Sequence, residues 1–251
     1  MKSNDTFPKY EQSYTLLEKV YRTFGGKPVM MGLSTTKEDC TMEATQRKTD
    51  RRTLYTRQVV KDALLKLLAE HHFEDINITM LCRQAEITRA TFYLHFDGIS
   101  AVVDELLEEA LGIAEQEGRA PGRDLIEFMD WLGRKDDPAL LLEHYNELPT
   151  CLRVAEEPKY QPLFMDDFLS TVVIRKIVLT EQEKMLPFWV ASGLPERQAK
   201  IMFQYTVYGS YMVNKAFRFQ RTEEWCHMTC SLLTFVAGGH RALRRRKTET
   251  L

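Results

Sequence analysis

The segment ITRATFYLHF, residues 87–96, opens with side chains that can form several hydrogen bonds at once. Thr88, Arg89 and Thr91 stand close together, with the small Ala90 between them. The Arg89 guanidinium can donate two parallel hydrogen bonds to a guanine edge or bind a phosphate, and the threonine hydroxyls can reach either group. Ala90 permits a close approach of the backbone. These residue types therefore fit the recognition of double-stranded DNA.

The second half of the segment combines polar and apolar aromatic residues. Tyr93 and His95 can place a hydroxyl and an imidazole against a nucleic-acid backbone. Phe92 and Phe96 are four residues apart, which is the spacing of one helix face, and we expect them to pack in the core. A short aromatic helix that only fills a core has the same spacing, so the pattern by itself leaves both interpretations open.

Three helices are predicted to position this segment. The first becomes regular from Tyr55 and has one apolar face, formed by Val60, Ala63, Leu64, Leu67 and Leu68. Asn77 can cap a second helix over residues 78–85, and Thr88 can cap a third over residues 89–95, since each side chain can accept from a free N–H of the first turn. Only Ala-Glu-Ile separates the two short helices, and this spacing matches a helix-turn-helix.

The rest of the chain predicts more helices and no strand. Apolar residues recur at helical intervals over residues 100–117, 124–134, 138–148, 163–185, 195–219 and 222–243. We therefore expect an all-α fold in four parts: an N-terminal extension (1–50), a three-helix helix-turn-helix domain (51–98), a larger helical domain (99–243) and a basic tail (244–251).

The larger helical domain offers two further expectations. Gly209 and Ser210 permit close helix approach, so residues 195–243 are predicted to pair two subunits as a four-helix bundle. Side chains that could line a cavity or simply pack are Trp131, His144, Tyr145, Tyr205, Tyr208, Tyr211 and Asn214.

Composition excludes several classes of protein. With 34 Lys and Arg against 36 Asp and Glu, the net charge of −2 gives no general attraction to nucleic acid, so any such binding must be local. No apolar run approaches the roughly 20 residues of a transmembrane helix, and the first residues lack the apolar core of a secretion signal. We expect a cytoplasmic protein without membrane partners, with its five scattered cysteines as reduced thiols.

The run FEDINITMLCRQAEITRATFYLHF, residues 73–96, resembles the DNA-binding region of the TetR/AcrR family of bacterial transcriptional regulators. The matching positions are Phe73, Ala85, Ile87, Thr88, Arg89, Thr91, Phe92, Tyr93, His95 and Phe96. This resemblance implies a homodimer that binds a palindromic operator, usually as a repressor, and is released by a small effector held in the larger helical domain. Carried over by position, it implies base contacts from Thr88, Arg89, Ala90 and Thr91, and phosphate contacts from Tyr93, His95, Asn77 and Thr79.

Two positions depart from the family pattern. Glu86 replaces the glycine of the turn, so it must adopt the backbone of that glycine and brings a negative charge toward the DNA. Ile99 stands where a lysine is usual, which removes one phosphate contact. The basic run at the end of the loosely ordered extension, from Arg47 to Arg57, is a candidate replacement, either as a minor-groove arm or as solvated surface. The alternative function is a ligand- or partner-binding protein of the same architecture with weakened DNA binding.

No pattern predicts catalysis or a bound cofactor. The sequence has no phosphate-binding loop, no recognisable catalytic carboxylate pair and no nucleophile elbow, so we expect no catalytic residues. Cys226, His227 and Cys230 lie on one predicted helix, with His240 further on, but a metal site needs ligands from another element. We therefore expect these residues to pack between helices and the protein to hold no metal.

Overall fold

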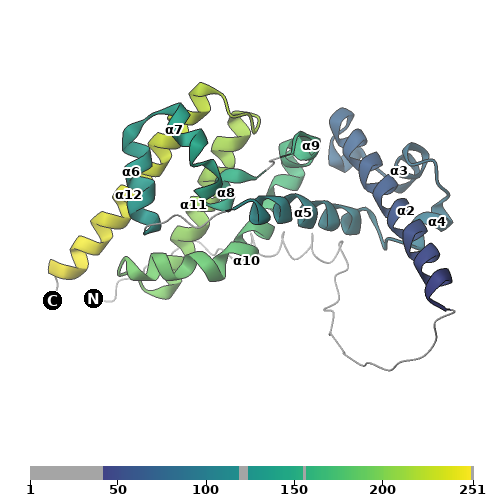
Figure 1. Ribbon diagram of the computed structural model, residues 1–251, viewed down its shortest axis with the longest axis horizontal. Coiled ribbons are helices and arrows are strands. Elements are labelled where there is room, and N and C mark those ends of the chain that lie inside the picture. The colour runs from purple at the N-terminus through teal and green to yellow at the C-terminus, as the bar shows by residue number, and fades with distance from the viewer. Residues whose placement is uncertain (1–41, 119–123, 155–156, 250–251) are drawn as a thin grey trace, which may run out of the picture. The chain divides into compact units, whose positions relative to one another are not determined.

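The computed structural model of the protein describes residues 42–118, 124–154 and 157–249 (Figure 1). Every regular element in these ranges is a helix and none is a strand, which confirms the predicted all-α class. The chain divides into a unit of residues 1–54 and a unit of residues 55–251, and the second holds α3 (Ile78–Gln84) and every later helix. Among the described helices, none combines the length and the apolar character that a transmembrane span requires.

The first described helix is longer than the sequence pattern indicated. Helix α2 runs from Met42 to Glu70, whereas the periodicity predicted a start near Tyr55 and a loosely ordered segment before residue 51. The added part, EATQRKTDRR, contains neither glycine nor proline and is rich in residues that favour helices. Because it is polar all round, it carries no apolar period that could reveal it. The rest of the predicted N-terminal extension, residues 1–41, lies outside the described residues.

Two short helices follow α2 at the predicted places. After a 3₁₀ turn (η1, Phe73–Asp75) come α3 and α4 (Arg89–Tyr93). A common core fixes them: its fully buried side chains are Val60, Leu64, Leu81 and Phe92. Phe92 and Phe96 stack with their ring centroids 5.8 Å apart, so both predicted core aromatics are confirmed.

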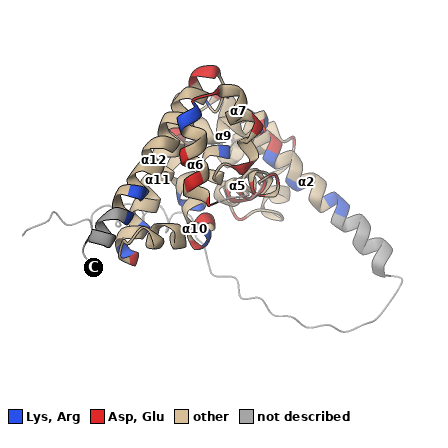
Figure 2. Cartoon of the chain, turned by 60° about the vertical axis from the view of Figure 1, so that its left-hand side comes forward, with Lys and Arg blue, Asp and Glu red and all other residues tan. Residues whose placement is uncertain are grey.

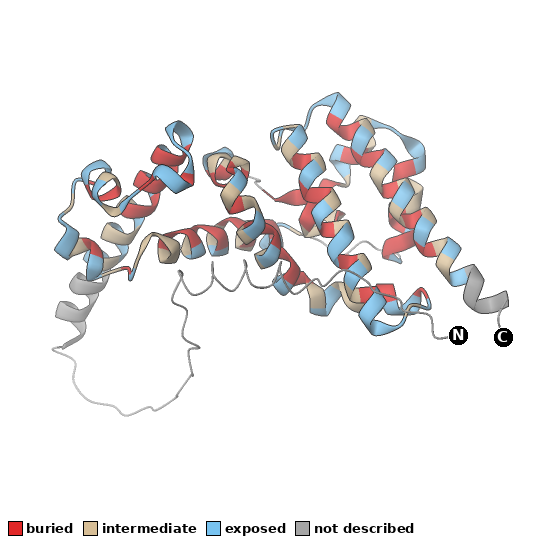
Figure 3. Cartoon of the chain, turned by 180° about the vertical axis from the view of Figure 1, so that it is seen from behind, coloured by how far each residue is buried: buried red, intermediate tan, exposed pale blue. Residues whose placement is uncertain are grey.

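Two helix pairs form the most extensive contacts among the later helices. Helix α5 (Ile99–Gln116) leads to α6 (Leu125–Lys135), α7 (Pro138–Glu143), α8 (Thr150–Arg153), α9 (Gln161–Met165), α10 (Asp167–Ala191), α11 (Glu196–Ala216) and α12 (Glu223–Glu249). Helix α10 lies along α11, and α12 lies along α6. Each long helix has a buried stripe and an exposed face (Figure 3).

The packing of α6 on α12 depends on one glycine. A Cβ atom at Gly133 would lie 2.7 Å from the Cys230 carbonyl oxygen and 2.8 Å from the Thr234 nitrogen, both backbone atoms of α12. Real Cβ atoms do not come this close to backbone, so only glycine allows this approach. Helix α12 is thereby held against α6, a partner that sequence periodicity could not identify.

Three predicted helix boundaries were wrong. The helix expected over residues 138–148 ends at Glu143 and gives way to a 3₁₀ turn (η2, Tyr145–Glu147). Leu148 is extended, as expected for the residue before Pro149, so no helix continues through it. The helix expected over residues 163–185 is broken at Asp166, which caps a new helix, α10, that extends to Ala191. The predicted tail is helical up to Glu249, where α12 ends.

Candidate functional site

Both short helices begin at the predicted capping residues. The Asn77 Oδ1 atom accepts a hydrogen bond from the Met80 N–H at 3.1 Å, and the Thr88 Oγ1 atom accepts one from the Thr91 N–H at 3.1 Å. Each bond satisfies a donor that has no partner within its own helix. The sequence thus predicted correctly where α3 and α4 start.

The corner between α3 and α4 is held in a conformation that favours glycine. Glu86 has a φ of 53°, in the left-handed region, as its place in the sequence pattern predicted. The Ile87 N–H donates to the Cys82 carbonyl at 3.0 Å, which closes the end of α3. For a residue with a Cβ atom, the conformational free energy in this region is roughly 1–2 kcal/mol higher than in the right-handed region. The corner is therefore strained, and its exposed carboxylate stands beside α4.

Helix α4 exposes a small polar and aromatic surface. Thr88, Arg89 and Ala90 are exposed, and the Tyr93 side chain is half-exposed. The Thr88 and Thr91 hydroxyls hydrogen-bond to each other at 2.9 Å, so each already has one internal partner. We call Thr88, Arg89, Ala90 and Tyr93 the α4 face. Since Phe92 is fully buried behind it, this face stands on a rigid base.

The remaining predicted contacts are distributed around α4. Asn77 and Thr79 are exposed at the start of α3, and His95 is partly buried just after α4. Arg57 is turned to partners inside the protein: it donates to the His95 carbonyl at 2.6 Å, pairs with Glu105 and lies 4.5 Å from the Phe96 ring centroid. The structure thus brings the other predicted residues to the surface around α4 but engages Arg57 in joining α2 to α5.

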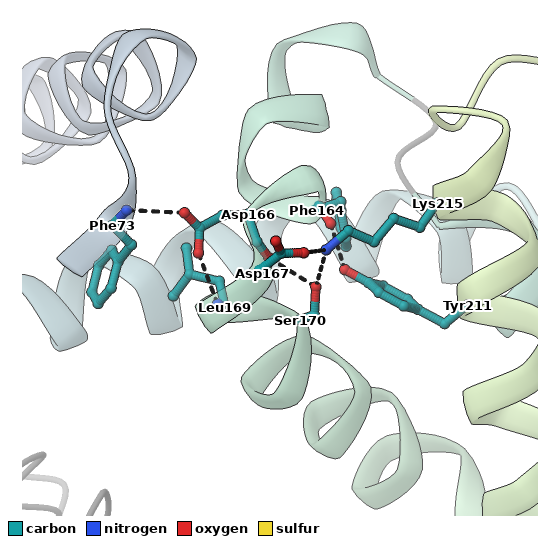
Figure 4. Close-up of polar contacts among 8 residues, drawn as sticks. All are labelled: Phe73, Phe164, Asp166, Asp167, Leu169, Ser170, Tyr211 and Lys215. Atoms are coloured by element: carbon teal, nitrogen blue, oxygen red, sulfur yellow. Dashed lines mark hydrogen bonds and ion pairs between the residues drawn. The ribbon is translucent and has the colours of Figure 1, made fainter. Parts of the chain in front are cut away.

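The sequence did not reveal a junction between η1 and α10, which Asp166 forms (Figure 4). Its Oδ2 atom accepts from the Phe73 N–H at 2.9 Å, and its Oδ1 atom accepts from the Leu169 N–H at 2.9 Å. The Phe73 and Phe168 rings stack beside it with centroids 5.6 Å apart. One buried carboxylate therefore caps α10 and also holds the segment that leads into α3.

Helix α11 supports the same junction from the other side. Lys215 Nζ contacts the Asp167 carboxylate at 2.7 Å and the Ser170 hydroxyl at 2.6 Å, and the Tyr211 hydroxyl donates to the Phe164 carbonyl at 2.6 Å (Figure 4). Burial raises the pKa of Tyr211, and the hydrogen bond to Lys215 lowers the pKa of Asp167. We call these contacts, together with Asp166, the Asp166 junction.

A second feature lies at the other end of α10 and α11. A pocket that opens to solvent is lined mainly by apolar side chains from α6, α8, α10, α11 and α12. Its polar lining residues are Thr150, Cys151, Glu181, Thr206, Ser210 and His240. None of the seven residues predicted as cavity candidates lines it. Tyr211 and Asn214 are instead core residues, and Tyr205 and Tyr208 are exposed.

No metal cluster of three or more His, Cys, Asp or Glu side chains occurs among the described residues. Cys226 and Cys230 are buried free thiols. His227 lies on the surface, 2.8 Å from an Asp136 carboxylate oxygen, which raises the histidine pKa. Cys226, Cys230 and His240 are buried as predicted, whereas the prediction that His227 packs between helices was wrong, because it pairs with Asp136 on the surface.

Both signs of charge are interspersed over the described helices (Figure 2), so any DNA contact must depend on individual side chains such as Arg89. Comparisons with protein-family models, with curated proteins and with solved structures find no match to this chain.

Proposed function

We propose that the protein is a dimeric DNA-binding transcriptional regulator of the TetR/AcrR type, a repressor released from a palindromic operator by a small ligand. The observation that carries this proposal is the α3–α4 unit, which has two capped short helices, a three-residue corner and an exposed polar face on a rigid aromatic base. In this proposal, the α4 face enters the major groove, where Arg89 contacts a guanine or a phosphate. Thr91, Asn77, Thr79 and His95 add base and backbone contacts.

The contacts of α10 support a ligand response. The Asp166 junction lies at the N-terminal end of this helix and the pocket lies near its C-terminal end, and α11 contributes residues to both. A ligand that changes the packing of α10 on α11 therefore acts on the helix that holds η1. In a dimer, this movement changes the separation of the two α4 faces and hence the fit to two half-sites.

Exposed apolar side chains support a dimer through residues 195–243. Ile201, Tyr205, Tyr208 and Met212 follow one another at intervals of four, three and four residues, so they form one exposed face of α11. On α12, Met228 and Phe235 are exposed seven residues apart, and a Cβ atom at Gly239 would meet nothing within 4 Å. Such a face favours pairing with a second copy, which would cover it.

Selection of bound DNA fragments tests the proposal directly. The purified full-length protein is incubated with genomic fragments at moderate salt, and the retained DNA is sequenced and footprinted. We expect a protected palindrome, and we expect Arg89→Ala to lower operator affinity by about 1–3 kcal/mol, the range for one bidentate base contact. Arg175→Ala removes the same charge from the exposed side of α10 and should leave affinity unchanged. Fragments retained without any shared sequence would contradict the proposal.

A second function is favoured by Glu86 and Ile99, which place an acid and an apolar residue near the α4 face. In this alternative the chain binds a ligand or a protein partner and has lost tight DNA binding. Ile99→Lys distinguishes the two functions, because it restores one phosphate contact at the first residue of α5. A small increase over existing operator affinity supports the regulator, whereas binding that appears only in the variant supports the alternative.

A further inference from the structure

Glu181 is a buried acid in an otherwise neutral, largely apolar pocket wall. It lines the pocket from α10 and is 8% exposed. Its Oε1 atom is buried and has no hydrogen-bond partner among the described residues. A buried carboxylate oxygen that lacks a donor is costly, and a bound group that donates a hydrogen bond to it would remove that cost.

Lys184 pairs with Glu181 but does not donate a hydrogen bond to its Oε1 atom. Lys184 Nζ lies 3.6 Å from Oε1, which is within ion-pair range but too far for a hydrogen bond. The same ammonium also pairs with Glu115, and its side chain is half-exposed. Arg153 is buried and donates to the carbonyls of Leu148 and Ala114. Among the described residues that line the pocket there is no lysine or arginine.

The other ionisable groups of the lining are neutral near pH 7. Burial lowers the pKa of His240 to about 4, and its Nδ1 atom is in hydrogen-bond contact with the Ser192 hydroxyl. Burial raises the pKa of the Cys151 thiol to about 11, with Ser210 as its hydrogen-bond partner. Glu181 therefore supplies the charge that a ligand in this pocket meets.

The rest of the wall is apolar and aromatic. Phe188, Trp189 and Phe203 line it together with Met129 and Met185. Aromatic faces attract cations as well as flat apolar groups, and methionines adapt to irregular shapes. A carboxylate beside such a wall suits a molecule with a positively charged hydrogen-bond donor at one end and an aromatic or apolar body at the other.

We propose that the pocket binds organic cations of the arylalkylammonium kind, with the ammonium donating to Glu181 and the aryl group against Phe188, Trp189 and Phe203. This inference deepens the proposed function and rests on it only for the role of the ligand as effector. Binding to the pocket itself requires no DNA.

Calorimetric titration of the full-length protein without DNA tests the inference with three probes of similar size. These are 2-phenylethylammonium, the neutral 2-phenylethanol and the anionic phenylacetate. We expect the cation to bind at least about tenfold more tightly than the alcohol, which is the ratio that one net charge-assisted hydrogen bond supplies, and we expect the anion to bind most weakly. Equal affinities for the cation and the alcohol would overturn the inference.

Two variants locate the effect, and a control accompanies them. Glu181→Gln keeps the size of the side chain and should abolish the preference for the cation, whereas Glu183→Gln removes an exposed charge from the same helix and should leave the preference intact. Thr206→Phe keeps the carboxylate but fills the pocket and should weaken all three probes. If the cation preference persists in Glu181→Gln or binding is unchanged in Thr206→Phe, the site is not this pocket.

The failure of this inference can be told apart from the failure of the proposed function. Selective binding of the cation without operator binding would contradict only the proposed regulator. Operator binding without selectivity for the cation would contradict only this inference.

Discussion

Replacing Asp166 by alanine removes two interactions that belong to different parts of the fold. The first is the N-cap of α10, through the Leu169 N–H, and the loss of such a cap costs about 1 kcal/mol. The second is the acceptor of the Phe73 N–H in a buried position, and an unsatisfied buried donor costs about 1–3 kcal/mol. We therefore expect Asp166→Ala to lower the free energy of unfolding by about 2–4 kcal/mol.

Asp124 provides a matched control for this prediction. It also caps a helix, but within the described part of the chain its Oδ1 atom accepts only from Ile126 and Glu127 of its own α6. Urea unfolding monitored by circular dichroism should therefore give a loss of only about 1 kcal/mol for Asp124→Ala. The excess loss in Asp166→Ala measures the bond to Phe73. If the two variants lose the same stability, Asp166 acts only as a helix cap and the proposed connection from α10 to η1 is refuted.

Four further predictions concern single positions. Because the pKa of His240 falls from 6.5 to about 4 on folding, the unfolded chain takes up the proton first, and stability should decrease by about 2 kcal/mol from pH 7.5 to pH 5 in urea unfolding; His240→Gln should show a correspondingly flatter dependence. Glu86→Gly should raise the thermal midpoint through a gain of up to about 1 kcal/mol, whereas Glu86→Ala, which keeps the Cβ atom, should not. Gly133→Ala should cost about 1–3 kcal/mol on chemical unfolding because of its clash with α12, while Gly209→Ala, where the space is open, should cost nothing. Tyr208→Glu should convert the proposed dimer to monomers in analytical ultracentrifugation, and an unchanged mass would exclude this face as the interface.

The sequence predicted the local structure around α4 in detail. Asn77 and Thr88 were identified as caps because capping depends on a side chain and a backbone N–H only three residues away. Glu86 was expected to adopt the backbone of a glycine because the family pattern has glycine at this turn, and its φ of 53° agrees with that expectation. Phe92 and Phe96 were assigned to the core from their spacing alone. Each of these features is determined within one or two turns of chain.

The residues that the sequence did not reveal depend on distant partners. Asp166 receives a hydrogen bond from Phe73, 93 positions earlier, and nothing in the local pattern around it indicates this contact. Glu181 lies in a helix with other acids, so only burial distinguishes it from Glu183. Arg57 appeared to be one of a run of basic residues, and its commitment to Glu105 and Phe96 follows from the packing of α2 on α5. Side-chain identity and spacing cannot show such contacts.

The length of α10 gives its two ends a mechanical relationship. Asp166 and Glu181 are separated by 15 residues, or about 22 Å along a helix axis, and the proline of this helix, Pro187, lies beyond both. The segment between them is therefore a stiff lever arm. A tilt of about 5° that pivots at Glu181 would move the Asp166 end by roughly 2 Å, and the backbone of Phe73 is hydrogen-bonded to that end. In the proposed regulator, a displacement of this size would be large for two α4 faces that match the grooves of a DNA duplex at a fixed spacing.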